Sequence, residues 1–352
     1  MAQSALRDKD KRVLTLIVEG FVRLGKPVSS GFIAQDKTLG VSPATVRNIM
    51  AKLEDQGYLA QPHTSAGRVP TDKGLRFYVR SLLAETRFPG DDSPLFQEDF
   101  PTQTADFDAL LNQASRALAD STDSLGFVIS PSVSRVPFEH LRFIRISDRR
   151  IMIILVTPFH MVLTDTLESS LPMSQAELDR ASLYINQNFR GRSMNLVRET
   201  LLQELPRFRA RYEDTVNKLI ELIKATVDRE DGENRIFIQG SSRLLDKAEL
   251  FDIGKLKALF QNFEEKAHLV KLLSDYISLE RVKVLIGTEI EVPAVQDCSL
   301  VISHYGYRNQ VLGSLGIIGP KRIPYGRIIP LVDRIAMRLS HALTIIGREV
   351  SL

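Results

Sequence analysis

Apolar residues recur at helical spacing near the start of the chain. Lys9–Leu24 carries an apolar stripe made of Val13, Leu16, Ile17, Phe21 and Leu24. Because such spacing places side chains on one face of a helix, the pattern predicts a helix there. Ser29 and Ser30 are good capping residues and predict a second, shorter helix that runs to about Leu39.

A third helix is predicted to begin at Ser42. Ser42 suits the N-cap position, and Pro43 suits the first helical position, where its missing N–H has no partner to lose. The apolar stripe of this helix consists of Val46, Ile49, Met50 and Leu53. Gly57 is a candidate C-cap. The opposite face is polar and carries Thr45, Arg47, Asn48 and Lys52.

The residues after this helix predict a hairpin-like loop. Tyr58–Gln61 is strand-like, Pro62–Pro70 is a polar loop, and Thr71 starts another helix that runs to about Glu85. The order helix, helix, turn, helix, strand, loop is that of a winged helix-turn-helix domain.

The rest of the chain mixes strands with helices. Strands are predicted at Gly126–Ser130, Leu141–Ile146, Ile151–Thr157, His160–Thr164, Arg235–Gln239, Val282–Gly287, Leu300–His304 and Gln310–Ile317. Helices are predicted at 174–191, where Ser174 and Glu177 form a capping box, at 195–228 with an interruption at Pro206, at 253–278, and at 326–346. Strands, a helical interval and then strands again indicate one α+β domain with an insertion.

Composition excludes several classes of protein. The single cysteine, Cys298, allows no disulfide within the chain, which favours a reducing compartment. The charged N-terminus lacks the apolar core of a signal peptide, and no run of residues is long and apolar enough for a membrane span. These features predict a cytoplasmic protein with no membrane contact.

The sequence shows no pattern typical of an enzyme, a metal site or a cofactor site. The six histidines lie far apart, without metal-ligand spacing, and Cys298 is interpreted as a small buried hydrophobe. The glycine motif Gly313–Gly319 has the spacing GxxGxxG, and Pro320 follows where a dinucleotide-binding fold begins a helix. It is therefore interpreted as a strand that enters a turn, and we predict no catalytic residues, metal or cofactor.

Charge is distributed unevenly along the chain. Residues 1–80 contain 13 Lys and Arg against 7 Asp and Glu, a balance of 13 − 7 = +6, whereas the whole chain carries only +3. A basic module therefore precedes a mildly acidic body. Basic modules bind nucleic acid through its phosphates, although a solvated surface would show the same imbalance.

The polar face of the third helix has the residue types that read DNA bases. An α-helix fits the major groove, where Arg bonds guanine, Asn bonds adenine and Thr meets a thymine methyl group. The candidate contacts on this helix are Ser42, Ala44, Thr45, Arg47 and Asn48, with Lys52 placed for a phosphate. The loop supplies His63, Thr64, Ser65 and Arg68, with Gly67 allowing a tight turn. Such a wing rests on phosphates or inserts Arg68 into the minor groove.

Two blocks of sequence resemble a known family. SPATVRNIMAKLEDQGYLAQPHTSAGRVPTDKGLRFYV, from Ser42 to Val79, resembles the N-terminal domain of the heat-inducible transcription repressors of bacterial chaperone operons, the HrcA family. LGSLGIIGPKRIPYGRIIPLVD, at Leu312–Asp333, is similar to the second signature of that family. The likeness spans nearly the whole chain, although 85–125 and the helical middle are weakly diagnostic.

The resemblance implies an α+β multidomain fold. It implies a winged helix-turn-helix domain at 1–87, a linker at 88–104, a GAF-like domain at 105–205 and 276–352, and a helical dimerisation domain inserted at 206–275. It also implies a homodimer that binds double-stranded DNA at an inverted-repeat operator upstream of chaperone operons. Its activity would depend on the GroE chaperonin, which helps to keep such repressors folded.

Other interpretations stay open from the residues alone. The GAF-like domain of a winged-helix regulator would respond to a small-molecule effector if it held a pocket with convergent polar groups. The N-terminal module would serve contact with another protein if it did not bind DNA. A metabolic enzyme is a more distant alternative.

Overall fold

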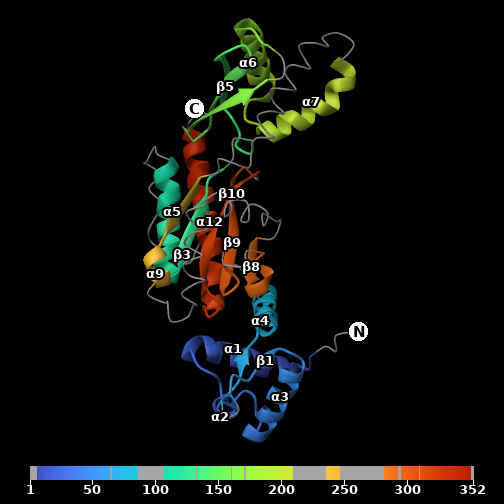
Figure 1. The fold of residues 1–352 in the computed structure, drawn as a ribbon, viewed down its shortest axis with the longest axis vertical. Helices are drawn as coiled ribbons and strands as arrows, with labels where there is room; N and C mark the ends of the chain where they lie inside the picture. Colours follow the sequence, from blue (N-terminus) through green and yellow to red (C-terminus); the bar gives the residue numbers. More distant parts are fainter. Residues whose placement is uncertain are drawn as a thin grey trace.

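The structure is a computed structural model that describes residues 6–63, 66–85, 107–131, 134–159, 161–169, 172–208, 235–245, 281–291, 295–308 and 310–349. Three parts follow one another along its longest axis (Figure 1). An N-terminal helical module lies at one end, a five-stranded sheet lies in the middle, and a three-stranded sheet lies at the other end. No helix in the described part of the chain is long and apolar enough to cross a lipid bilayer.

The N-terminal module, residues 6–85, has the order of elements expected from the sequence. These elements are α1 (Asp8–Leu24), α2 (Ser30–Ala34), α3 (Pro43–Asp55), β1 (Leu59–Ala60), β2 (Val69–Pro70) and α4 (Asp72–Glu85). Strands β1 and β2 pair antiparallel, so three helices are followed by a hairpin and a fourth helix. The apolar stripe predicted for α3 is turned inward, with Val46, Met50 and Leu53 buried.

Helix α2 ends earlier than predicted, at Ala34 instead of near Leu39. The carboxylate of Asp36 accepts a hydrogen bond from the backbone N–H of Thr38 at 2.8 Å. A short polar side chain that bonds the backbone two residues on favours a turn over a helix, which explains the early end. Leu39 is nevertheless buried.

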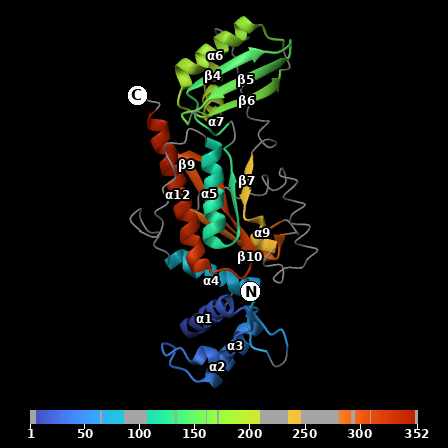
Figure 2. The ribbon, with the colours of Figure 1, turned by 90° about the vertical axis from the view of Figure 1, so that its left-hand side faces the viewer.

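The middle part is built on one antiparallel sheet in the strand order β7-β3-β10-β9-β8. Its strands are β3 (Leu125–Ile129), β7 (Ile236–Gln239), β8 (Val282–Ile286), β9 (Cys298–Tyr307) and β10 (Gln310–Pro320). Helices α5 (Phe107–Thr122) and α12 (Tyr325–Glu349) contact each other and cover the same face of the sheet (Figure 2). Two short elements, α9 (Ser241–Leu245) and the 3₁₀ turn η2 (Gly287–Glu289), complete it.

Two interpretations of this part are confirmed. The glycine motif at Gly313–Gly319 lies within β10, so it is a strand and not a phosphate loop. Cys298 is a free thiol, 1% exposed, at the start of β9. Burial raises the pKa of this thiol to about 12, so it behaves as a small hydrophobe at neutral pH.

The far end contains a separate three-stranded sheet. Its elements are β4 (His140–Arg145), β5 (Arg150–Val156), β6 (Val162–Glu168), α6 (Gln175–Phe189) and α7 (Met194–Phe208). The sheet and the two helices share an apolar core that is distinct from the one beneath the five-stranded sheet. The capping box predicted at Ser174 and Glu177 is present at the start of α6.

Helix α6 also protects the outer edge of the three-stranded sheet. The amide of Asn186 bonds both the N–H and the carbonyl of Leu141 at 2.8 Å. Ser182 accepts a hydrogen bond from the N–H of Phe143 at 3.0 Å. Side chains thus pair with backbone groups that an edge strand would otherwise leave open.

The division of the chain into domains stays a prediction, and three observations bear on it. The segment 134–208 has its own sheet and core, although the predicted GAF-like domain includes most of it. Strand β7 lies within the predicted insertion, yet it pairs with β3 of the five-stranded sheet. Residues 209–234 and 246–275 lie outside the described residues. Helix α7 continues through Pro206 to Phe208, so the interruption predicted at Pro206 is wrong.

Candidate nucleic-acid interface

The start of α3 is fixed by a local capping interaction. The Ser42 hydroxyl accepts a hydrogen bond from the N–H of Thr45 at 3.2 Å, and the two hydroxyls lie 3.0 Å apart. This satisfies one of the backbone donors that the first turn of a helix leaves open. Ser42 therefore acts as the predicted N-cap, and its hydroxyl is already bonded to Thr45.

The exposed face of α3 presents the predicted base-reading residues. Ala44, Thr45, Arg47 and Asn48 are all exposed, while Val46 between them is fully buried. Among the described residues, neither the Arg47 nor the Asn48 side chain has a hydrogen-bond or ion-pair partner. Side chains of this kind keep their donors available for an outside ligand, as a reader of base edges needs.

Lys52, one turn further along the same helix, is held inside the module. Its Nζ lies 2.5 Å from Oδ2 of Asp10 in α1. The Asp10 side chain is only 6% exposed, whereas that of Lys52 is 43% exposed. A buried carboxylate requires a partner, so Lys52 holds α3 against α1. Only the exposed part of the Lys52 side chain is left to contact a phosphate.

Arg68 in the loop is also committed to a partner within the chain. Its Nε donates to Oε2 of Glu54 at 2.8 Å, and its side chain is 19% exposed. Its backbone exchanges two hydrogen bonds with Val28, each 2.9 Å long. Arg68 therefore ties the hairpin to α3 and to the segment before α2, in place of the free side chain expected for minor-groove insertion.

Gly67 is required by close packing. A Cβ atom added at Gly67 would lie 2.3 Å from the carbonyl oxygen of Val28. Because this neighbour is backbone, it cannot rotate away, and only glycine fits beside it. The sequence led us to expect a tight turn here, but the physical reason is this contact.

The tip of the loop is only partly described. His63 is exposed, and its carbonyl accepts a hydrogen bond from the N–H of Ala66 at 2.8 Å. The side-chain amide of Gln61 donates to the carbonyl of Ala66 at 3.0 Å, which closes the loop. Thr64 and Ser65, two of the predicted contacts, lie outside the described residues.

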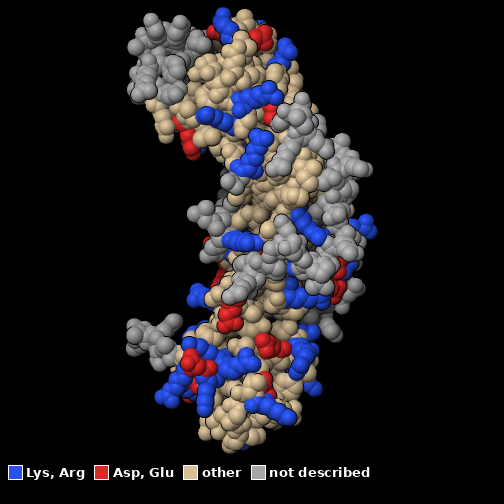
Figure 3. All heavy atoms as spheres, turned by 180° about the vertical axis from the view of Figure 1, so that it is seen from behind, with Lys and Arg blue, Asp and Glu red and all other residues tan. Residues whose placement is uncertain are grey.

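The surface of the N-terminal module is rich in cations. Figure 3 shows many Lys and Arg side chains over the lower part of the molecule, with some Asp and Glu among them. This agrees with the +6 balance of residues 1–80. Mixed charge of this kind attracts a polyanion while it leaves individual cations paired with acidic neighbours.

The sequence did not indicate two acidic residues that organise this surface. Asp10 and Glu54 each hold one of the predicted DNA contacts, Lys52 and Arg68. Asp10 lies 42 positions from Lys52, and Glu54 lies 14 from Arg68. Neither spacing is a helical neighbour distance, so no local pattern identifies these pairs.

Comparison with known proteins places the chain among repressors. Residues 108–329 match the family model described as HrcA protein C terminal domain. The heat-inducible transcription repressor HrcA of Geobacter sulfurreducens is 36% identical over 338 residues, which cover 96% of this chain and 98% of that protein. The HrcA of Xanthomonas euvesicatoria pv. vesicatoria is 35% identical over 343 residues, which cover 97% of each.

A solved structure has a similar fold over the same length. It is described as a crystal structure of a hypothetical protein, and it matches with a TM-score of 0.65 and 25% sequence identity. The match covers 97% of this chain and 100% of that one.

Proposed function

This chain belongs to the HrcA family of heat-inducible transcription repressors, and we propose that it represses transcription by binding an operator in double-stranded DNA. The observation that carries the proposal is the face of α3 on which Arg47 and Asn48 are exposed. In this proposal α3 enters the major groove and its N-terminal turns contact base edges. The hairpin between β1 and β2 lies over the phosphate backbone beside it.

The proposed reading residues divide by role. Arg47 and Asn48 contact base edges, because an exposed guanidinium and an exposed amide can each form two hydrogen bonds with one base. Ala44 and Thr45 allow the helix to approach closely. Ser42 contributes by fixing the helix start, and His63, Thr64 and Ser65 contact the backbone from the loop.

We also propose that the protein acts as a homodimer on an inverted repeat. Two-fold symmetric proteins bind two half-sites of opposite orientation, so dimer and operator share their symmetry. The segment expected to form the dimer, residues 206–275, lies largely outside the described residues. Sedimentation tests this directly, since a monomer at micromolar concentration that still occupies the full operator would contradict the dimer.

Regulation in this proposal acts through folding. Heat raises the unfolded fraction and occupies the GroE chaperonin with other clients, so the pool of active repressor falls by mass action. A change of one or two kcal/mol is a large part of the stability of a domain, so a few degrees change that pool several-fold.

A gel-shift titration with an inverted-repeat promoter fragment, with and without chaperonin, tests function and regulation together. We expect specific binding whose active fraction rises with chaperonin after heating, while the affinity of folded molecules stays constant. Absence of specific binding at any active fraction would overturn repression through this operator. A constant active fraction would overturn the chaperonin step alone.

One observation favours effector binding by the five-stranded sheet as a second candidate function. Ser314 of β10 is fully buried, and its hydroxyl has no hydrogen-bond partner in the described part of the chain. It lies directly opposite His304 of β9. Burial and the nearby charges of Arg135 and Lys283 lower the pKa of His304. In this second proposal, a small anion would accept a hydrogen bond from the Ser314 hydroxyl.

Thermal unfolding in the presence of small anions tests the effector. A ligand that raises Tm in the native protein but not in Ser314→Ala, and that also shifts operator affinity, would establish this second function. If no ligand changes operator affinity, regulation through the folded fraction of the repressor remains as the mechanism.

A further inference from the structure

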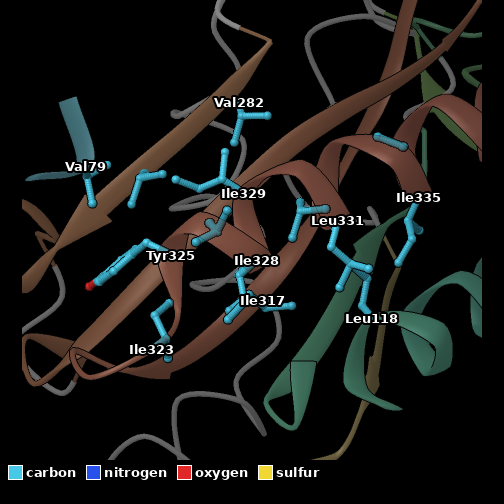
Figure 4. Close-up of a cluster of buried hydrophobic side chains, with 14 of the residues drawn as sticks. Val79, Leu118, Val282, Ile317, Ile323, Tyr325, Ile328, Ile329, Leu331 and Ile335 are labelled. Atoms are coloured by element: carbon cyan, nitrogen blue, oxygen red, sulfur yellow. The ribbon is translucent and has the colours of Figure 1, made fainter. Parts of the chain in front are cut away.

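Helix α4 belongs to two parts of the molecule at once. It contacts α1 and β2 of the N-terminal module and β8 of the five-stranded sheet. Its buried side chains include Leu75, Tyr78 and Val79. In Figure 4, Val79 points toward Tyr325 and Ile329 of α12, within one apolar cluster that runs from the module into the sheet. The Tyr78 and Tyr325 rings meet edge to face, with their centroids 6.5 Å apart.

Polar contacts surround this apolar contact. The Asp72 carboxylate at the start of α4 pairs with Nζ of Lys321 at 2.8 Å. The Arg76 guanidinium donates from Nη1 to the carbonyl oxygen of Val284 at 2.7 Å and from Nε to Oε1 of Glu289 at 2.5 Å. We call these residues and the Tyr78–Tyr325 pair the α4 clamp.

The clamp residues outside α4 are themselves held in place by hydrogen bonds. The Tyr325 hydroxyl donates to the carbonyl of Lys321 at 2.8 Å and lies 2.6 Å from the Ser299 hydroxyl. Glu289 accepts a hydrogen bond from the N–H of Ile286 at 2.9 Å, which ties it to the end of β8. The partners that α4 meets are therefore fixed by the sheet, and the clamp joins two ordered surfaces.

The two surfaces also fit closely. Gly287 has a φ of +60°, and a Cβ atom there would lie 2.0 Å from Oδ2 of Asp72 and 2.7 Å from Nζ of Lys321. At the end of α1, a Cβ on Gly25 would lie 1.8 Å from Nη1 of Arg322. Both glycines leave room for the charged side chains that cross between the module and the sheet.

We propose that the α4 clamp holds the N-terminal module at one orientation to the five-stranded sheet and thereby sets the half-site spacing that the protein recognises. The inference rests on the proposed binding of a dimer to an inverted repeat. In such a dimer the two copies of α3 must match two half-sites about one helical turn or a multiple of it apart. Domains within a chain move relative to each other unless their interface is substantial, and a mobile module would accept many spacings.

The separation of roles follows from the positions of the residues. Arg47 and Asn48 are exposed on α3, whereas the clamp residues lie on α4, on α12 and at the near end of the five-stranded sheet. The clamp residues are therefore positioning residues. Their loss leaves the affinity of one module for one half-site intact, but it lowers the effective concentration of the second module at the second half-site.

The test uses the full chain and the Lys321→Glu variant, which places like charges at Asp72. Affinity is measured on the operator, on the operator with five base pairs inserted between its half-sites, and on a single half-site. Half a helical turn rotates one half-site to the other side of the duplex. For the native protein we expect the insertion to weaken binding about 100-fold, within the range by which linked modules gain affinity.

Lys321→Glu is expected to lose about tenfold in affinity for the operator, so that the penalty for the insertion shrinks to about tenfold. Affinity for the single half-site stays unchanged. The reversed pair Asp72→Lys with Lys321→Glu restores the native penalty. Lys321→Met, which keeps the aliphatic stem, should reduce the penalty for the insertion by a smaller factor. It replaces Lys321→Glu in the test if the reversed charge prevents folding. Arg327→Glu is the matched control, because it reverses the charge of an exposed residue in the first turn of α12, shortly after Lys321.

Each outcome decides one claim. A folded Lys321→Glu protein that keeps the native penalty for the insertion would overturn the clamp. An equal loss of affinity on operator and half-site would also overturn it, since the residue would then act within the reading module. A native protein that binds no operator would instead overturn the proposed function.

Discussion

The two ends of α3 carry similar polar side chains and use them differently. Near the N-terminus, the side chains of Arg47 and Asn48 are exposed and have no hydrogen-bond or ion-pair partner among the residues that the structure describes. Near the C-terminus, Lys52 pairs with Asp10, and Glu54 pairs with Arg68. A cation on a surface helix is therefore available to a ligand only where the folded chain has not already supplied its partner.

This difference separates the proposed DNA contacts on α3 from the residues that hold α3 in place. The free end of α3 can offer its donors to a base without breaking a bond within the protein. The paired end fixes α3 against α1 and the hairpin, which holds the free end in position. Substitutions at the two ends should consequently change different quantities.

The largest effect is expected where the hairpin meets the body of the module. Gly67→Ala forces a methyl group against the backbone of Val28, so the hairpin must shift. We expect a loss of about 3 kcal/mol in the free energy of unfolding, the upper range for overpacking. Chemical denaturation followed by circular dichroism measures it.

Gly31→Ala is the matched control, because a Cβ at this helical glycine meets nothing within 4 Å. It should leave stability unchanged or raise it by up to about 1 kcal/mol. Equal destabilisation by the two substitutions would contradict the role of the close contact at Gly67.

At the free end, Arg47→Ala and Asn48→Ala should each weaken specific binding by about 1–3 kcal/mol, the cost of a lost base contact. Stability should change by less than about 0.5 kcal/mol, because neither side chain supports the fold. Titration against operator and scrambled DNA separates specific from general affinity.

Lys26→Ala, which removes an exposed cation outside α3 and the hairpin, controls for loss of charge in that titration. It should weaken binding to the operator and to the scrambled duplex by the same factor. The same pattern in Arg47→Ala or Asn48→Ala would show that the reading face lies elsewhere.

At the paired end, Lys52→Met should lower the free energy of unfolding by about 1–2 kcal/mol, because it leaves the buried Asp10 carboxylate without its partner. The value is below that for a fully buried pair, since water reaches the Lys52 side chain. Adding Asp10→Asn should recover part of the loss. Unchanged stability together with a flatter salt dependence of DNA binding would make Lys52 a phosphate contact instead.

The smallest effect is expected for the partly exposed pair Arg68 and Glu54. Arg68→Met and Glu54→Gln should each cost about 1 kcal/mol in stability, as partly screened ion pairs do. A double-mutant cycle should show that the second substitution adds little to the first. Full additivity would mean that the two side chains act independently.

Much of this organisation was determined by the sequence alone. The N-cap at Ser42 and the capping box at Ser174 depend on residues three positions apart, and successive residues of the inward stripe of α3 are three or four positions apart. Local backbone geometry dictates these features, so the periodicity of apolar residues and the identity of caps predict them. The exposure of Arg47 and Asn48 follows from the same periodicity.

Only the tertiary structure decided which distant residues and strands became partners. Lys52 pairs with Asp10, and Asp72 pairs with Lys321. Strand β7 pairs with β3 in the five-stranded sheet, again across a long stretch of chain. Such contacts depend on how elements pack, and no short-range pattern encodes them. The two sequence blocks at Ser42–Val79 and Leu312–Asp333 look independent along the chain. The fold brings them together at the α4 clamp, because an ion pair between distant residues forms only after packing has closed the loop between them.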